Sequence, residues 1–250
     1  DLGNRGLFGL QIPESYGGLG LNHRDTVAIL QQLSAIDVSL ATLVFLHNTN
    51  GLRPILNFGS EEMKSQLLPG LAAGRQLAAF ALSEPVAGSN IGAIQTKAIR
   101  EAKSGWQLSG EKRWNGSSWA GVVTVIAREY DADGTSHGVS AFLVRQGTPG
   151  LKVGEESLTL GMRAIVQNSL QLDHVSADPA SQLGTTGGGW KVVNDALSVG
   201  RLMTAAVCLG GTKRAAQLLF RYAGVREIAS GKLIDHPHTR QRLAEITSQI

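Results

Sequence analysis

The sequence lacks the features of an extracellular, membrane or nucleic-acid-binding protein. It has one cysteine in 250 residues, Cys208, which excludes an internal disulfide framework and is typical of a reducing compartment. No apolar run reaches the ~18 residues that a membrane-spanning helix needs, and the N-terminus shows no signal-peptide pattern. The net charge is only +3, without a basic stripe. We therefore expect a cytoplasmic protein without a membrane span or a nucleic-acid partner, in which Cys208 packs as a small hydrophobic side chain.

Metal-binding and nucleotide-loop patterns are also scarce. His236 and His238 lie beside Asp235, but no distant third ligand has the spacing of a metal site, so we expect no metal and a polar loop that opens a helix. The glycines at 187–189 are not followed by Gly-Lys-Ser/Thr, which excludes a phosphate loop. A Ser-His-Asp order with a nucleophile elbow is absent as well.

The first part of the chain, residues 1–76, has helical periodicity. Val27, Leu30, Leu33 and Ile36 recur at a spacing near 3.6 residues, and Asn22 or Asp25 can start that helix. A second apolar stretch, 39–58, contains Pro54, which predicts a break or a kink. Ser60 predicts an N-cap for a further short helix, and Gly74 predicts its stop.

The middle part, residues 77–185, changes to short β-branched runs separated by turns. The segments 121–127 and 139–144 are predicted strands, with a turn at 131–134 between them. The segment 106–110 resembles the edge of a hairpin. This spacing predicts an antiparallel barrel or sandwich.

The last part, residues 186–250, returns to helix. The segment 190–229 has a long periodic pattern, Gly231 is a predicted stop, and Pro237 can begin a further helix. Two helices leave an apolar face uncovered, so we expect further chain or another subunit to cover it. The order of the parts predicts an α+β protein: an N-terminal helical domain, a central antiparallel β-barrel or sandwich domain and the start of a C-terminal four-helix bundle.

Two short segments are candidates for a ligand site. In Ser83-Glu-Pro-Val-Ala-Gly-Ser-Asn90, backbone amides and the hydroxyl of Ser89 could face a phosphate, while Leu82 and Ser83 could bind the pyrimidine edge of a flavin. An ordinary loop of small residues is the alternative. In Gly110-Glu-Lys-Arg-Trp-Asn-Gly-Ser117, the indole of Trp114 could pack on an isoalloxazine face. A core tryptophan is the alternative there.

These segments resemble the acyl-CoA dehydrogenase and oxidase family, which has T/S-E-P-x-A-G-S-D followed by G-x-K-x-W. Further matches follow the family order along nearly the whole chain: P-E-x-Y-G-G-L-G at 13–20, F-G-[ST]-E-E at 58–62, L-G-x-R at 160–163, the helix string that ends at Arg201 and the one that ends at Arg226. Ordered matches are far more specific than any single one.

The resemblance implies a function and a set of contacts. The implied reaction is FAD-dependent α,β-dehydrogenation of an acyl thioester, as acyl-CoA or acyl-carrier protein, with hydride passing to flavin N5, in fatty acid metabolism. The implied electron acceptor is an electron-transfer flavoprotein or oxygen, and the implied assembly is a homodimer or homotetramer. The implied FAD contacts are Phe80, Leu82, Ser83, Gly88, Ser89, Trp114, Gly116, Ser117 and, toward a neighbouring subunit, Arg226. Ser89 and Arg201 are the implied substrate contacts.

The catalytic base is the gap in this pattern. Proton abstraction α to a thioester calls for a carboxylate, and some family members carry it directly before the arginine that Arg201 matches. That position is Gly200 here, and Asp195 is nearly two helical turns away. The resemblance implies that the base of most family members lies beyond the stretch equivalent to Ile250, so we expect it outside this sequence. The first residue, Asp1, predicts a fragment or a processed form. A flavin-dependent monooxygenase on the same scaffold and a non-catalytic binding module remain alternatives.

Overall fold

The computed structural model describes residues 2–101, 105–119 and 121–250. Its main helices are α1 (His23–Ile36), α2 (Val38–Leu46), α3 (Leu52–Phe58), α4 (Glu61–Ala72), α5 (Gly189–Val225) and α6 (Pro237–Ser248). The main strands are β1 (Leu77–Ala81), β2 (Lys97–Glu101), β3 (Gly105–Gly116), β4 (Gly121–Tyr130), β5 (Ser136–Arg145), β6 (Leu151–Glu156), β7 (Gln167–Ala177) and β8 (Gln182–Leu183). A ribbon of β9 (Glu227–Ile228) and β10 (Gly231–Lys232) separates the last two helices. The predicted α+β class is confirmed.

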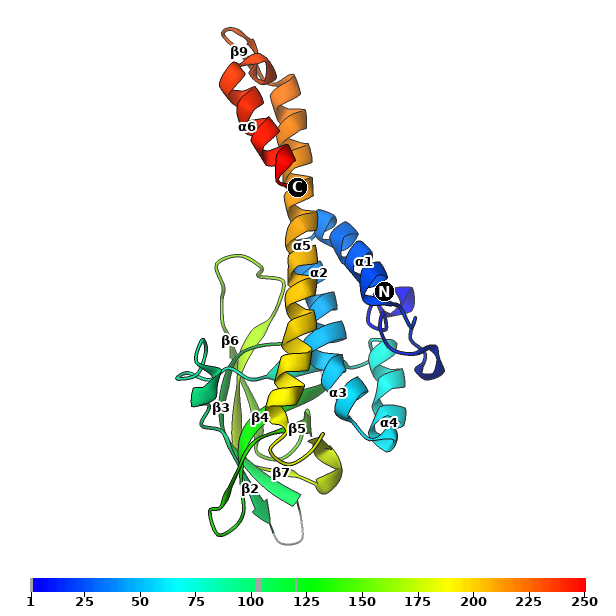
Figure 1. Cartoon of the computed structure of the whole chain (residues 1–250), viewed down its shortest axis with the longest axis vertical. Helices are drawn as coiled ribbons and strands as arrows, with labels where there is room; N and C mark the ends of the chain where they lie inside the picture. Colours follow the sequence, from blue (N-terminus) through cyan, green and yellow to red (C-terminus); the bar gives the residue numbers. More distant parts are fainter. Residues whose placement is uncertain (1, 102–104, 120) are drawn as a thin grey trace.

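Helix α5 is the axis of the molecule (Figure 1). Helices α1 to α4 lie on one side of it, the sheet lies at its beginning, and its far end projects with α6 beyond both. By length and hydropathy α5 could cross a membrane, but a core helix passes the same test, and α5 packs along α1 and α2. Cys208 lies on α5 and is exposed, so the expectation that it packs inside was wrong.

The eight strands of the main sheet have the order β6-β7-β3-β2-β4-β5-β8, with β1 beside β4. Most pairs are antiparallel, as predicted, but β4 runs parallel to both β1 and β2, and the described strands do not close into a barrel. The hairpin predicted at 106–110 is confirmed, because this part of β3 pairs antiparallel with β2, but β3 also pairs with β7 and is therefore not an edge strand. The division of the chain into three domains at 76 and 185 stays a prediction.

Strand β4 is buried on both faces because its side chains alternate between two cores. Val122 and Ile126 join a core with α3, α4 and the beginning of α5, whereas Val123 and Val125 join a core formed with β3, β5 and β7. A third core packs α1 and α2 against α5 around Leu30. The helices therefore cover one face of β4, and side chains from β3, β5 and β7 cover the other face.

Local capping confirms several predicted boundaries. The Asp25 N–H donates to Asn22 Oδ1 at 3.0 Å, and the Met63 N–H donates to Ser60 Oγ at 3.1 Å. Pro237 is the first residue of α6. The predicted stop at Gly231 was wrong, because α5 ends at Val225 and the φ of +117° at Gly231 serves the β9–β10 ribbon instead.

The irregularity expected at Pro54 lies upstream of it. Residues His47–Gly51 form one π-helical turn, and α3 continues through Pro54. The ring of a proline clashes with the carbonyl four residues earlier in an α-helix, and the wider turn accommodates this. A Cβ on Gly51 would lie 2.2 Å from the Ala78 carbonyl oxygen, so the turn lies directly against β1.

His47 in this turn joins three parts of the chain. The Ala78 N–H donates to its Nδ1 at 3.0 Å, so the proton is on Nε2, which donates to the Phe8 carbonyl at 3.1 Å. The ring is 1% exposed, and burial lowers the pKa of His47 from 6.5 to about 4. The native fold therefore requires the neutral imidazole.

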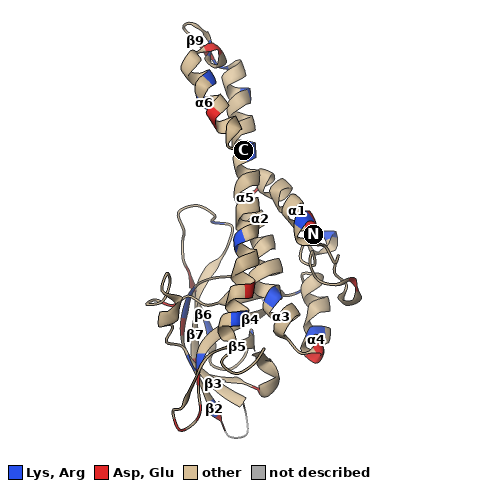
Figure 2. Ribbon diagram, viewed as in Figure 1, with Lys and Arg blue, Asp and Glu red and all other residues tan. Residues whose placement is uncertain are grey.

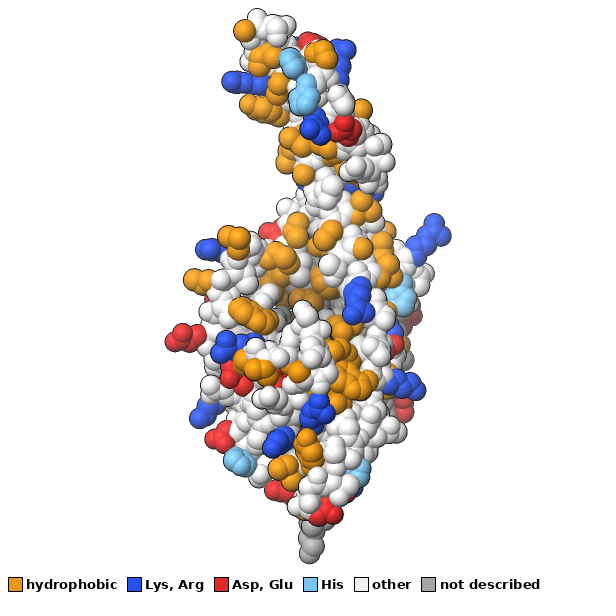
Figure 3. Space-filling view, turned by 60° about the vertical axis from the view of Figure 1, so that its left-hand side comes forward, with side chains coloured by type: hydrophobic (Ala, Val, Ile, Leu, Met, Phe, Trp, Pro, Cys, Tyr) orange, Lys and Arg blue, Asp and Glu red, His pale blue; other side chains and the backbone are white. Residues whose placement is uncertain are grey.

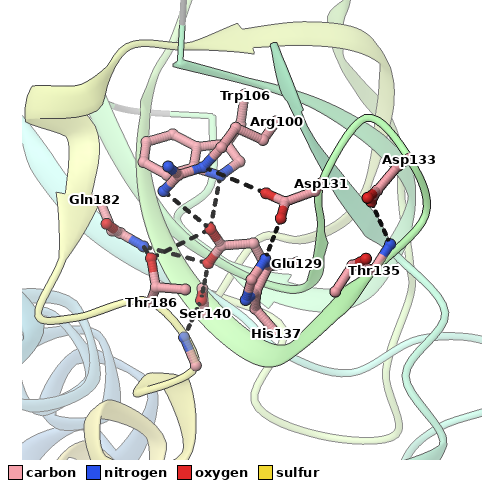
Figure 4. A network of polar contacts seen from close by, with 11 residues as sticks. Arg100, Trp106, Glu129, Asp131, Asp133, Thr135, His137, Ser140, Gln182 and Thr186 are labelled. Carbon is pink, nitrogen blue, oxygen red and sulfur yellow. Dashed lines mark hydrogen bonds and ion pairs between the residues drawn. The ribbon is translucent and has the colours of Figure 1, made fainter. Parts of the chain in front are cut away.

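A buried carboxylate attaches the beginning of α5 to the sheet (Figure 4). Glu129 on β4 accepts from Trp106 Nε1 at 2.9 Å, from Thr186 Oγ1 at 3.3 Å and from the Ser140 hydroxyl. The same hydroxyl accepts from the Gly187 N–H at 2.8 Å. The loop before α5 is thus fixed on β4 and β5 through one carboxylate.

The close approach of α5 to α1 predicts the effect of two glycine substitutions. A Cβ on Gly210 would lie 2.2 Å from the Gln31 carbonyl oxygen and 2.0 Å from Ser34 Oγ, whereas a Cβ on Gly224 of the same helix meets nothing within 4 Å. We expect Gly210→Ala to lower the free energy of unfolding by about 2–3 kcal/mol through overpacking, and Gly224→Ala to raise it by about 0.5–1 kcal/mol. Urea unfolding of both variants checks this, and equal effects would contradict the packing of α5.

Candidate functional site

The two motif segments lie side by side in the structure. The Arg113 N–H on β3 donates to the Ser83 carbonyl at 2.9 Å, and Lys112 Nζ donates to the Leu82 carbonyl at 3.1 Å. The residues that follow β1 are therefore bound to the strand that carries Trp114. These contacts join positions 30 residues apart in the sequence, and the motifs together form one surface.

A buried ion pair holds the two segments together. Glu84 Oε1 accepts from Lys112 Nζ at 2.7 Å and from Thr96 Oγ1 at 2.6 Å, and Glu84 Oε2 accepts from the Gln95 N–H at 2.6 Å. The Lys112 side chain is 0% exposed and that of Glu84 is 3% exposed. Both residues stand inside the motif strings, but the sequence did not indicate that they pair.

The pKa values of the pair move in the directions that burial and pairing dictate. Burial raises the pKa of the Glu84 carboxyl, but the hydrogen bonds from Lys112, Thr96 and Gln95 outweigh this effect and hold the pKa below its ordinary value. Burial lowers the pKa of Lys112 to about 8, against the opposing effect of Glu84. At neutral pH the pair is a carboxylate and an ammonium.

Strand β3 is distorted at Trp114. Its pairing with β7 shifts register between Lys112 and Asn115, and Trp114 has a φ of +61°. Ser117 has a φ of +60° three residues later. Positive φ is rare for residues other than glycine, and such strain and bulges cluster at functional sites.

The distortion turns a large aromatic side chain outward. Trp114 is 59% exposed, so the alternative of a core tryptophan was wrong. Nearby, Ser117 is buried and Gly116 is half-buried. A Cβ on Gly116 would lie 3.5 Å from Leu46 Cδ1 and 3.6 Å from Ile165, which places this end of β3 beside α2 and the segment before β7.

The turn after β1 presents its small residues to solvent. Glu84 and Ala87 exchange backbone hydrogen bonds of 2.9 and 3.1 Å, which closes the turn. Gly88 and Ser89 follow it and are exposed, and a Cβ on Gly88 would meet nothing within 4 Å. Phe80 lies half-buried in β1, opposite Thr124 of β4.

The two predicted arginines lie far apart, Arg201 on α5 and Arg226 directly after the end of this helix. Arg201 and Arg226 are both exposed, and their separation of 25 positions corresponds to roughly 37 Å of helix. Arg226 follows the projecting end of α5, which lies far from the sheet (Figure 1). The structure therefore does not bring Arg226 to the surface around Trp114 within one chain.

The positions considered for a base are occupied by structural contacts. Asp195 accepts from Arg53 Nε at 3.0 Å and Nη2 at 2.7 Å, and from Asn57 Nδ2 at 2.9 Å, which joins α5 to α3. Figure 2 shows an acidic position on α5 beside a basic position on α3. A Cβ on Gly200 would lie 2.4 Å from Asn50 Oδ1. Gly200 therefore permits the contact between α5 and the π-helical turn, and neither position offers a free carboxylate.

Hydrophobic side chains gather where α5 meets the β domain. Figure 3 shows them along the helix and around a hollow at this junction. Leu202 on α5 and Leu160 and Met162 in the segment before β7 are exposed.

A buried polar atom lies near the same end of β3. Asn168 Oδ1 on β7, opposite Asn115 on the neighbouring strand, has no hydrogen-bond partner among the described residues.

Family models match three consecutive parts of the chain. The acyl-CoA dehydrogenase N-terminal domain matches residues 1–75, the middle domain matches 79–175 and the C-terminal domain matches 187–250. Among curated proteins, an acyl-CoA dehydrogenase of Bacillus subtilis is 34% identical over 226 residues, which is 90% of this chain and 59% of that protein. The chain thus spans about three-fifths of the length of this relative.

Solved structures share the fold at high similarity. An acyl-CoA dehydrogenase from Bacillus anthracis in complex with FAD has a TM-score of 0.91 and 31% identity, over 98% of this chain and 41% of that one. The prolyl acyl carrier protein oxidase AnaB has a TM-score of 0.92 and 27% identity, over 98% of this chain and 65% of that one.

Proposed function

Because this chain belongs to the acyl-CoA dehydrogenase family, we propose that it forms the flavin site of an FAD-dependent enzyme that dehydrogenates an acyl thioester between its α and β carbons. The resemblance drawn from the motifs is confirmed by the family models. One observation carries the proposal: Trp114, held at a positive φ in a bulge of β3, exposes its indole on the strand that binds the turn at 83–89, whose Gly88 and Ser89 are exposed.

The residues at this surface suit FAD. A flat ring needs an apolar face, and the exposed indole of Trp114 supplies one. The open space at Gly88 and the exposed Ser89 suit a diphosphate, which backbone amides and hydroxyls bind. Leu82 and Ser83 would bind the pyrimidine edge of the ring, and Phe80, Gly116 and Ser117 would complete the site.

Each group has a distinct part in the proposed reaction. FAD, when bound, accepts the hydride that leaves the β carbon. Trp114 would exclude water from one face of the ring, and Arg201 would bind the phosphates or pantetheine of the substrate, with Ser89 close to both ligands. Arg226 would reach the FAD of a second subunit, because within one chain it lies far from Trp114.

We also propose the carrier of the acyl group, the electron acceptor, the assembly and the compartment. The thioester carrier is CoA or an acyl-carrier protein, and the similarity to a carrier-protein oxidase keeps both open. The acceptor is an electron-transfer flavoprotein or oxygen, the assembly is a homodimer or homotetramer, and the compartment is the cytoplasm.

Anaerobic titration tests the function. The protein that contains this chain should purify yellow with FAD, and an acyl-CoA should bleach its visible absorbance without oxygen. A series of acyl chains of increasing length, each as CoA and as carrier-protein thioester, then identifies the substrate. Protein that binds no FAD and gains no thermal stability from it would instead be a binding module.

A second candidate function follows from Gly200 and Asp195. Neither supplies a free carboxylate to remove the α proton, and a flavin-dependent monooxygenase would not need that base. Oxygen consumption by the chemically reduced protein, coupled to a hydroxylated product, would favour this candidate. Bleaching by an acyl-CoA in the absence of oxygen would exclude it.

Substitution of Trp114 tests the placement of the flavin. We expect Trp114→Ala to raise the Kd of FAD about tenfold, since one aromatic contact contributes about 0.5–1.5 kcal/mol, and Trp114→Phe to retain most of the affinity. Trp119→Ala is the matched control, because Trp119 is 48% exposed but lines a separate cavity with Gln76 and Gln146. Titration followed by flavin fluorescence measures all three, and equal effects at 114 and 119 would refute the placement.

A further inference from the structure

Lys112 is completely buried, and its ammonium contacts the Glu84 carboxylate and the Leu82 carbonyl. Its ammonium lies inside the sheet, 2.7 Å from Glu84 Oε1 and 3.1 Å from the Leu82 carbonyl oxygen. Replacing a buried ion pair by apolar groups of similar shape is often neutral or stabilising, so net stability alone does not account for this pair. The geometry defined here is that of the peptide between Leu82 and Ser83.

The two peptides on either side of Ser83 are both held from β3. Lys112 holds the Leu82 carbonyl, and the Arg113 N–H holds the Ser83 carbonyl at 2.9 Å. The described residues contain no cis peptide bond, so the Ser83 N–H points opposite to the Leu82 carbonyl and away from Lys112. The Ser83 hydroxyl forms no hydrogen bond within the described part of the chain and is free to bind a ligand.

Glu84 keeps the ammonium in this place. Besides Lys112, it accepts from Thr96 Oγ1 at 2.6 Å, from the Thr96 N–H at 3.1 Å and from the Gln95 N–H at 2.6 Å. The carboxylate is thus fixed by the segment before β2, and it fixes the lysine in turn. Thr96 is buried, whereas Gln95 is exposed and holds the carboxylate through its backbone N–H.

We propose that Lys112 and Glu84 are positioning residues for the flavin, which lock the Leu82–Ser83 peptide so that its N–H and the Ser83 hydroxyl meet the pyrimidine edge of the ring. The inference rests on the proposed function. Neither residue touches the cofactor, and both act through Leu82 and Ser83. A cation on the Leu82 carbonyl also polarises this peptide and strengthens its N–H as a donor, which favours the more negative, reduced ring.

The double variant Lys112→Met/Glu84→Gln tests the proposal, because it removes both charges, keeps both shapes and leaves no unpaired buried charge. We expect it to fold, to bind FAD about tenfold more weakly, and to have a lower flavin midpoint potential. Tenfold greater loss of affinity for reduced than for oxidised flavin corresponds to about 30 mV for a two-electron couple. Circular dichroism, FAD titration and dye-coupled reduction of the holoenzyme measure these quantities.

The pair of Lys64 and Glu61 on α4 provides the control, since its Nζ–Oε1 distance is 2.8 Å and the Glu61 side chain is 79% exposed. Lys64→Met/Glu61→Gln should leave the FAD affinity and the potential unchanged. Thr96→Val, which removes one bond to Glu84 and no charge, should shift both in the same direction, with about threefold weaker FAD. If the double variant does not fold, the Thr96→Val variant alone tests the positioning role of Lys112 and Glu84.

The outcomes separate this inference from the function on which it rests. Wild-type protein that binds no FAD removes the proposed function. If the wild-type protein binds FAD, and the folded double variant or the Thr96→Val variant has the same FAD affinity and the same midpoint potential, only the positioning role of the pair is overturned.

Discussion

Glu129→Ala is expected to lower the free energy of unfolding by about 4 kcal/mol, because it removes a buried acceptor from several donors at once. Glu129 has 0% side-chain exposure, and its loss leaves the buried Trp106 indole N–H and the Ser140 hydroxyl without their acceptor. Arg100, 48% exposed at 3.6 Å, can turn to water and adds little. Urea unfolding followed by circular dichroism measures the loss.

Asp131→Asn is the control for this substitution. Asp131 lies beside the same network (Figure 4) and pairs with His137 at 2.7 Å, but its side chain is 38% exposed. We expect a change of about 0.5 kcal/mol or less, since exposed ion pairs contribute little. A similar loss for both variants would mean that the burial of Glu129, and with it the attachment of α5 to the sheet, is wrong.

Stability is expected to fall with pH through His47. The unfolded chain binds a proton at the ordinary pKa of 6.5, whereas the folded chain resists it until about pH 4. The unfolded state therefore binds more protons between these values, and stability falls as the pH is lowered across this window, by on the order of 3 kcal/mol. Protonation would place a second N–H against the Ala78 N–H.

His47→Gln isolates this contribution. The variant should be less stable than the wild type at pH 7, where it loses a hydrogen bond, and the difference should shrink as the pH falls toward 4. Carboxyl groups common to both proteins cancel in the comparison. Parallel stability curves for the two proteins would show that His47 does not titrate on unfolding in this way.

The sequence predicted what depends on neighbouring residues. Asn22, Ser60 and Pro237 lie at helix starts because a cap or a fixed φ acts over three or four positions, and the structure confirms them. The helix break near Pro54 was displaced, because the wider turn forms upstream where His47 bonds to β1 and the N-terminal segment. That position depends on partners that are distant in the sequence.

Long-range pairing accounts for the other differences. No local pattern indicates that β4 runs parallel to β1 and β2, since parallel pairing needs a crossover connection. The exposure of Trp114 depends on a bulge opposite β7, and the pairing of Glu84 with Lys112 depends on a turn meeting a strand 28 residues later. The motifs identified the right surface, while these contacts explain why it has its shape.

The π-helical turn at His47–Gly51 changes which side of the chain faces the interior between α2 and α3, which would otherwise form one continuous helix. Before it, Ala41, Val44 and Phe45 face the core around α1 and α5, and after it, Leu52 and Ile55 face the core of the sheet. One additional residue in a turn rotates the following side chains by about 100°. Deletion of a single residue in this turn would therefore rotate all of α3 about its axis. Leu52 and Ile55 would turn away from the sheet, and the polar side of α3 would face the interior.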